Sequence, residues 1–124
     1  MTLVLDASAL IALERGDRAT VAIVEAARLD GRALVVPAGV VAQTWRDGSR
    51  QALLARLLNA TDLAVEALTD EIARATGLLC GATETSDIVD ASIVIAARRH
   101  HATIVSSDRG DLTRLDQTLA IIDC

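Results

Sequence analysis

Short apolar runs alternate along the chain with longer segments in which apolar residues recur every three or four positions. The runs are typical of buried strands, and the longer segments are typical of amphipathic helices. Because the runs lack polar alternation, they favour a parallel sheet covered on both faces. The pattern predicts strands at residues 2–5, 33–36, 63–68, 103–106 and 119–122.

Capping and turn residues place helices between these strands. Asp17 and Thr69 are N-cap types, Pro37 suits the first turn of a helix, and Ser86 is a further cap candidate. Strands that alternate with helices indicate an α/β fold with a central, mostly parallel sheet. The predicted helices cover residues 8–14, 18–30, 37–45, 51–59, 70–81, 86–99 and a short turn at 112–115.

Length and composition favour a single globular domain over residues 1–124. Hydrophobic residues make up 52% of the chain, and Trp45 is its only aromatic residue. The apolar stretch at 33–42 contains Pro37 and Gly39 and is too short to span a bilayer. No basic, apolar leader is visible at the N-terminus, so we expect a soluble, cytoplasmic protein with no membrane attachment.

The charge pattern narrows the chemistry. The net charge is −5, and all 12 basic residues are arginines. An acidic protein binds nucleic acid poorly unless a local basic surface or a metal ion assists. The absence of lysine excludes P-loop and Schiff-base chemistry that depends on lysine.

Acidic residues stand where predicted strands end. Asp6 follows the first strand and Asp108 follows the strand at 103–106, while Asp90 lies in the first turn of a helix with Asp87 three residues earlier. The carboxyl ends of parallel strands share one edge of a sheet, and ligands bind there. Crowded carboxylates require a cation, so we predict a Mg²⁺ or Mn²⁺ site and metal-assisted chemistry on phosphate. Without metal, mutual repulsion should raise the pKa values of these acids.

Four segments occur in a familiar order: VLDASAL at 4–10, VPAGVVAQTWR at 36–46, SDIVDA at 86–91 and VSSDRGDL at 105–112. On these segments the chain resembles PIN-domain ribonucleases, and in particular the VapC toxins of type II toxin–antitoxin systems. The resemblance implies a three-layer α/β/α sandwich with four or five strands. It also implies a homodimeric, Mg²⁺- or Mn²⁺-dependent endoribonuclease that leaves 5′-phosphates and is inhibited by a VapB-type antitoxin. The implied substrate is a transfer or ribosomal RNA.

The resemblance assigns roles residue by residue. The family's aspartates fall on Asp6, Asp90 and Asp108, which we predict to be catalytic and to bind the metal. Asp87 is the acid often seen before the helix motif, and we include it among the metal ligands; Asp111 trails Asp108. Ser8 and Ser107 are expected to position a carboxylate or contact phosphate.

One position departs from the family pattern. The second acidic residue of the family, usually Glu, is Gln43 here, and an amide supplies no negative charge. An alternative is therefore a catalytically weak or silent PIN-fold module that acts by binding RNA or protein. Two other classes are excluded. A receiver domain requires a lysine beside its phosphoacceptor, and a haloacid-type phosphatase requires an acid where Ser8 stands.

Overall fold

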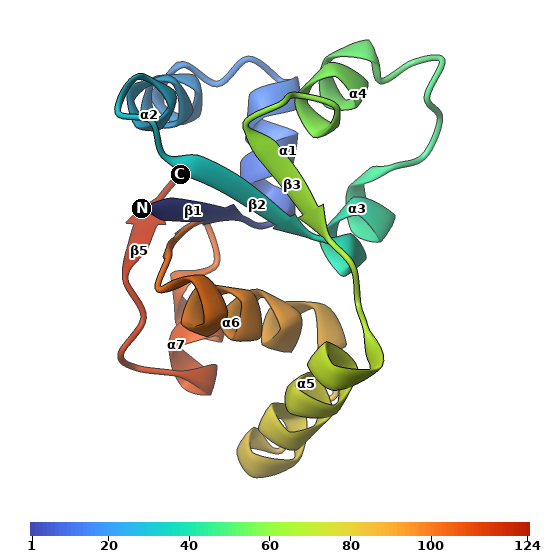
Figure 1. Ribbon diagram of the computed structural model, residues 1–124, viewed down its shortest axis with the longest axis vertical. Coiled ribbons are helices and arrows are strands. Elements are labelled where there is room, and N and C mark those ends of the chain that lie inside the picture. Colours follow the sequence, from blue (N-terminus) through green and yellow to red (C-terminus); the bar gives the residue numbers. More distant parts are fainter.

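The computed structural model describes all residues, Met1–Cys124, as a five-stranded sheet with seven helices (Figure 1). The strands are β1 (Thr2–Leu5), β2 (Ala33–Pro37), β3 (Leu63–Glu66), β4 (Thr103–Ser106) and β5 (Ile121–Asp123). The helices are α1 (Ala7–Glu14), α2 (Arg18–Leu29), α3 (Ala38–Thr44), α4 (Ala52–Leu58), α5 (Asp70–Thr83), α6 (Ile88–His100) and α7 (Arg109–Leu115).

The sheet is parallel throughout, with the strand order β3-β2-β1-β4-β5. The chain moves outward from β1 through β2 to β3 and then crosses to β4 on the other side of β1. Strand order therefore reverses between β1 and β4, which makes their carboxyl ends a topological switch point. Asp6 and Asp108 follow these two strands, so both lie at this point, as the sequence predicts.

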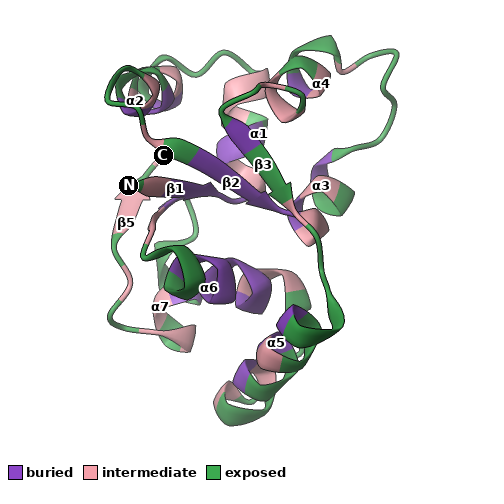
Figure 2. Ribbon diagram, in the orientation of Figure 1, coloured by how far each residue is buried: buried purple, intermediate pink, exposed green.

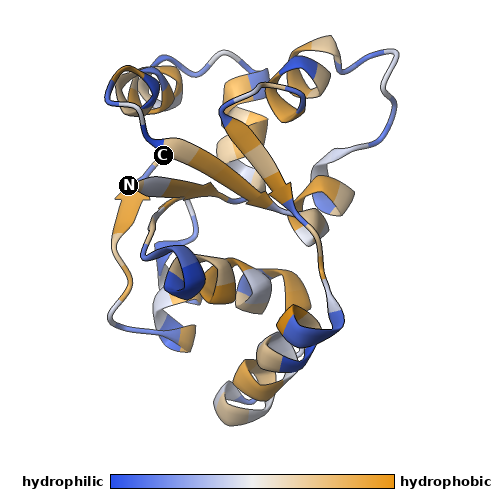
Figure 3. Ribbon diagram, viewed as in Figure 1, coloured by the Kyte–Doolittle hydropathy of each residue, from blue (hydrophilic) through white to orange (hydrophobic).

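Helices cover both faces of the sheet, which gives the three-layer α/β/α architecture predicted from the sequence. In Figure 1, α1, α2 and α4 lie on one side of the sheet, and α6 lies on the other side with α5 and α7. The central part of α6 is buried along seven consecutive residues, Ala91 to Ala97, whereas α5 is largely exposed (Figure 2). The strands and α1 are correspondingly coloured mostly as hydrophobic (Figure 3).

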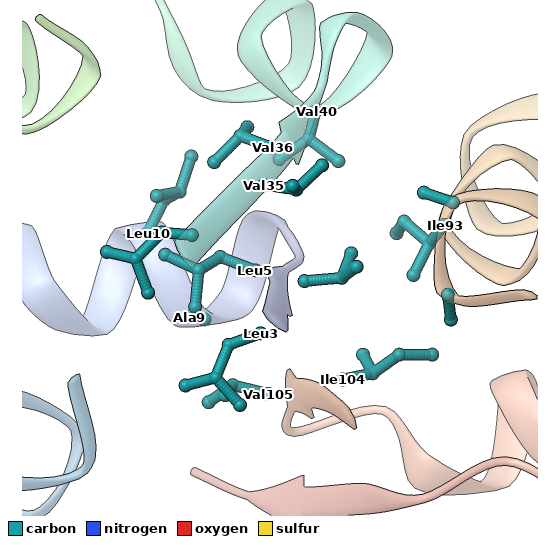
Figure 4. Packing of buried hydrophobic residues seen from close by; sticks show 14 of the residues in the cluster. Leu3, Leu5, Ala9, Leu10, Val35, Val36, Val40, Ile93, Ile104 and Val105 are labelled. Atoms are coloured by element: carbon teal, nitrogen blue, oxygen red, sulfur yellow. The ribbon is translucent and has the colours of Figure 1, made fainter. Parts of the chain in front are cut away.

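The core contains 24 buried hydrophobic residues, all of them Leu, Val, Ile or Ala. Successive strand residues point to opposite faces, so each strand supplies side chains to both layers. In Figure 4, Leu5 and Val36 lie on the side of Leu10 from α1, whereas Ile104 lies on the side of Ile93 from α6. This double packing fixes the sheet, and with it the strand ends that carry the acidic residues.

Element boundaries differ from the sequence prediction in a few places. Helix α5 continues past Gly81 to Thr83 and ends where Glu84 adopts a left-handed conformation with φ 56°. The N-cap of α6 is Asp87 rather than Ser86, because the Asp87 carboxylate accepts the backbone N–H of Asp90 at 3.0 Å. A whole helix, α7, replaces the predicted short turn, and β5 begins two residues later than expected.

None of the helices combines the length and the apolar character needed to cross a membrane.

Candidate acidic site at the carboxyl edge of the sheet

Asp6 forms the fixed part of the site. It ends β1 and caps α1, with Oδ1 accepting the backbone N–H of Ala9 at 2.9 Å and the Ser8 hydroxyl at 2.6 Å. The residue is only 4% exposed. A buried carboxylate needs such donors because burial without them would be costly. Asp6 is therefore held in one orientation by the turn that its own sequence segment forms.

Ser106 links the ends of β1 and β4. Its fully buried hydroxyl donates to Oδ2 of Asp6 and accepts the backbone N–H of Asp108 at 2.8 Å. A second link lies beside it, where the Ser107 N–H donates to the Ser8 hydroxyl at 2.9 Å. Two of these bonds, Ser106 to Asp6 and Ser107 to Ser8, join residues about a hundred positions apart, and together with the Asp108 amide they set the spacing between Asp6 and Asp108.

The roles of the serines are partly as predicted. Ser8 positions the Asp6 carboxylate, as the sequence suggests, but Ser107 contributes its backbone N–H rather than its hydroxyl. Ser106 was missed by the sequence analysis, although a polar residue at the end of an apolar run was a signal for it. In the sheet that position is completely buried, so its hydroxyl must find partners inside the protein.

Asp108 and Asp90 face other acids. Partial burial raises the pKa of Asp108, and the nearby carboxylates of Asp6 and Asp111 raise it further. Burial also raises the pKa of Asp90 to about 6, with further contributions from Asp87, Asp111 and Asp108. The pKa values of Asp90 and Asp108 are both raised, as predicted. The larger cause is burial, and repulsion between the acids is the smaller one. Asp6, Asp90 and Asp108 thus belong to one connected set of interacting acids, and Asp111 is part of it.

The outer part of this set lines a polar hollow of about 330 Å³. Asp87, Asp90 and Asp111 lie on its wall, between the end of α5 and the helices α6 and α7. One carboxylate oxygen of Asp87 caps α6, which is a structural role. The same carboxylate also adds negative charge beside Asp90. The hollow opens to solvent at the acids, where a hydrated ion or a phosphate has access.

Cationic partners are missing from the centre of the set. No arginine or histidine lies within 4.0 Å of the carboxylates of Asp6, Asp87, Asp90 or Asp108. Asp111 has one loose ion pair, at 3.6 Å, with Arg114 on the next turn of α7. Four acids of the set therefore have no ion-pair partner, and hydrogen bonds alone offset the charge of Asp6 and Asp87.

Gln43 lies on α3, is exposed, and forms no side-chain hydrogen bond within the protein. Helix α3 approaches the first turn of α6 closely, since a Cβ on Gly39 would lie 3.3 Å from a methyl carbon of Val89. Gln43 follows Gly39 by one turn and hence shares its side of the helix. The amide is available to solvent but adds no charge to the acidic set.

A hard, hydrated cation suits this donor set. The available ligands are carboxylate oxygens without cationic partners, and Mg²⁺ prefers oxygen while retaining several of its own waters. No group of three or more His, Cys, Asp and Glu side chains is arranged to hold a metal ion directly. The arrangement therefore favours binding that is partly through water. No histidine lies among the acids, and the half-buried Cys124 thiol lies beside Ser8 near Asp6 and Asp108.

Comparison with known proteins identifies the same architecture. Residues 3–117 match the family model described as "PIN domain". VapBC2 from Rickettsia felis, crystallised with a DNA fragment from its promoter, aligns with a TM-score of 0.77 and 13% identity over 100% of this chain and 99% of that chain.

Two further solved structures are similar. FitAcB from Neisseria gonorrhoeae gives a TM-score of 0.67 at 17% identity over 97% of this chain and 96% of that chain. VapC20 from Mycobacterium tuberculosis is described as a toxin that cleaves the sarcin–ricin loop. It aligns with a TM-score of 0.62 and 18% identity over 92% of this chain and 95% of that chain. No curated protein sequence matches the chain. At these identities the structural likenesses establish the fold, and the match to the family model covers most of the chain.

Proposed function

The chain belongs to the PIN domain family, and on this basis we propose that it is a Mg²⁺- or Mn²⁺-dependent endoribonuclease. One observation supports the proposal most: Asp6 and Asp108 stand without cationic partners at the switch point of a parallel sheet, and Asp108 also interacts with Asp90 at the start of α6. Such an arrangement costs free energy unless a cation or a cationic partner offsets it. Helix capping accounts for Asp6 and Asp87, but it gives no structural role to the carboxylates of Asp90 and Asp108.

Asp6, Asp90 and Asp108 would hold the metal, with Asp87 at the margin of the site. When bound, Mg²⁺ or Mn²⁺ polarises a phosphate and lowers the pKa of a coordinated water. Asp6 contributes a carboxylate already fixed by three hydrogen bonds, so little ordering is needed. Asp90 and Asp108 contribute negative charge at the open side, and their raised pKa values would fall on binding a cation.

We propose further that the protein is a cytoplasmic, homodimeric toxin held inactive by a VapB-type antitoxin. The similar structures support the antitoxin partner, because VapBC2 and FitAcB are complexes with VapB- and FitA-type antitoxins. An antitoxin arginine would suit the acidic set, since a guanidinium offers a planar fork to two carboxylate oxygens and competes with the metal. A structured RNA, transfer or ribosomal, is the proposed substrate, in keeping with the sarcin–ricin loop cleaved by VapC20.

The test is cleavage of total RNA by the purified protein with Mg²⁺, with Mn²⁺ and with EDTA. We expect metal-dependent products with 5′-phosphate ends, and a loss of roughly 100-fold or more in rate for Asp90→Asn. Asp70→Asn is the matched control, because Asp70 is 81% exposed and lies at the start of another helix. Equal cleavage by the wild type and Asp90→Asn, or cleavage that survives EDTA, would refute the proposal.

A binding module without catalysis is the second candidate, and Gln43 favours it. An exposed amide stands where the family pattern has an acid, so the acidic set lacks one charge. The same experiment separates the two functions. RNA that is retained by the protein but stays intact in every metal would support the binding module.

A further inference from the structure

The acidic set creates a problem for the proposed substrate. Phosphates approaching Asp6, Asp90 and Asp108 meet uncompensated negative charge, on a chain whose net charge is −5. A metal ion can neutralise the phosphate at the centre of the site, but it does not help the phosphates on either side. Binding of an RNA strand across the site therefore requires cations of the protein near both of its ends.

A groove of about 590 Å³ leaves the site along α1. Ser8 and Ser107, which carry the hydrogen-bond link beside Asp6, line its inner end, and Arg15 lines it at the end of α1. Arg15 is exposed and has neither an ion pair nor a side-chain hydrogen bond. Asp17 also lines the groove and stays ionised, because the hydroxyl and backbone N–H of Thr20 lower the pKa of its carboxyl, but it forms no ion pair with Arg15. Arg15 is thus the free cation of this groove.

The polar hollow on the other side also contains one cation. Arg114 is its only basic residue, and it shares the hollow with four acids, Glu84, Asp87, Asp90 and Asp111. The Arg114 side chain is 81% exposed, and its contact with Asp111 is long at 3.6 Å. Exposed ion pairs of this kind contribute little, so the guanidinium can exchange Asp111 for a phosphate at small cost.

The two arginines hold equivalent positions. Helix α1 begins at Asp6 and α7 begins at Asp108, so both helices start at the acidic set and carry an arginine at their far ends. At 1.5 Å per residue, the rise from Asp6 to Arg15 is roughly 14 Å and the rise from Asp108 to Arg114 is roughly 9 Å. This spacing suits a strand that runs a short way beyond the acids in both directions.

We propose that Arg15 and Arg114 are positioning residues that bind the phosphates of a single RNA strand on the two sides of the acidic set. The strand would enter along α1, cross the acids and leave through the hollow beside α7. The arginines would contribute to binding and alignment and would not touch the reacting atoms. The inference rests on the proposed ribonuclease function for its biological meaning, although RNA binding can be measured separately.

The test compares Arg15→Gln and Arg114→Gln with Arg74→Gln. Arg74 is a matched control because it is 79% exposed, pairs with an acid of its own helix, and changes the net charge equally. Binding of a short fluorescein-labelled single-stranded RNA of mixed sequence is measured by fluorescence anisotropy at several salt concentrations, in Ca²⁺, which takes oxygen ligands as Mg²⁺ does, and again in EDTA. We expect each test variant to weaken binding about tenfold and to lower the slope of log K against log salt by about 0.7. Arg114→Lys should restore the slope.

Cleavage of the same RNA in Mn²⁺ provides the second readout, with a raised KM and nearly unchanged kcat expected for both variants. If the wild type cleaves RNA but both variants match Arg74→Gln in binding and in KM, the inference is wrong and the ribonuclease function stands. If the wild type never cleaves RNA but the salt slope falls in both test variants, the proposed phosphate contacts of Arg15 and Arg114 stand and the ribonuclease function is wrong. If the wild type binds no RNA, the proposed phosphate contacts of Arg15 and Arg114 are wrong.

Discussion

At the scale of single residues, two aspartates of the site differ through their surroundings. Asp6 is buried and receives three hydrogen bonds, two from serine hydroxyls and one from a backbone amide. Asp90 is surrounded by Asp87, Asp108 and Asp111, and its pKa is raised to about 6. Hydrogen bonds hold the Asp6 carboxylate in the turn before α1, whereas the Asp90 carboxylate lines the polar hollow and is available to a ligand. The two residues should therefore respond differently to substitution.

Asp90→Asn should stabilise the metal-free protein. Since the pKa of Asp90 is about 6 when folded and 3.8 otherwise, the folded protein binds the proton more tightly than the unfolded chain. The free energy of unfolding therefore falls as the pH rises between these values, and the loss persists at neutral pH. After allowance for solvent screening, the variant should gain about 1 kcal/mol at pH 7.

Urea unfolding in EDTA across this pH range measures the effect. The variant should show a weaker pH dependence and its largest gain above pH 6. Equal gains at all pH values, or a destabilised variant at neutral pH, would contradict the electrostatic account of Asp90.

Gln43→Glu tests the position that departs from the family pattern. The side chain is exposed and makes no hydrogen bond, so the substitution should leave the metal-free melting temperature nearly unchanged. An added carboxylate should tighten Mn²⁺ binding by about threefold to tenfold, because ligand charge raises affinity for hard cations. Titration calorimetry with Mn²⁺ measures this change. Gln51→Glu would not serve as a control, because the Gln51 side chain forms hydrogen bonds with the backbone of the loop before α4.

An unchanged Mn²⁺ affinity in Gln43→Glu would place residue 43 outside the metal site. Increased affinity together with faster RNA cleavage would show that the natural glutamine weakens the enzyme.

At the scale of elements, the site depends on how β1 and β4 are joined at their carboxyl ends. The Ser106 hydroxyl bridges the Asp6 carboxylate and the Asp108 amide, and it is fully buried. Without it, a buried carboxylate oxygen and an amide would lose their partner. The bridge also fixes Asp108 relative to Asp6, so its loss should affect both stability and metal binding.

Ser106→Ala should lower the free energy of unfolding by about 2 kcal/mol, because two polar groups lose a buried hydrogen-bond partner. Ser107→Ala is the adjacent control. Its hydroxyl forms no hydrogen bond and its backbone N–H is retained, so a change within about 0.5 kcal/mol is expected. Urea unfolding of both variants gives the comparison, and equal losses would show that the bridge contributes nothing specific.

The sequence predicted most elements because their signals are local. Apolar runs gave the strands, and caps such as Asp17 and Thr69 gave helix starts that the structure confirms. The end of α5 was missed, since Gly81 lies in open space within the helix and does not break it. Ser106 was missed for a different reason: its hydroxyl donates to Asp6, a hundred residues away at the end of β1, and sequence spacing does not report such contacts.

At the scale of the whole molecule, strand order brings the acids together. Because β4 returns to the side of β1 opposite β2, Asp108 arrives beside Asp6, and α6 places Asp90 in the same set. The motif order suggested this convergence in advance. The electrostatic importance of Asp111 required the fold, since its contribution acts across space on both Asp90 and Asp108.

Mg²⁺ or Mn²⁺ should therefore stabilise the folded molecule. A cation at a concentration 100 times its Kd adds about 2.7 kcal/mol to the free energy of unfolding. Asp6→Asn keeps an oxygen for capping α1 but removes charge, and it should abolish most of the metal-induced rise in melting temperature. Thermal unfolding with and without metal measures the rise, and Asp70→Asn should respond as the wild type does. A full response in Asp6→Asn would exclude Asp6 from the site.

The most direct measurement is anomalous X-ray diffraction from a crystal of the protein grown or soaked with Mn²⁺. Our account predicts an anomalous peak among the carboxylates of Asp6, Asp90 and Asp108, with water completing the coordination. A protein that binds Mn²⁺ elsewhere, or leaves these carboxylates without a peak at saturating Mn²⁺, would contradict it.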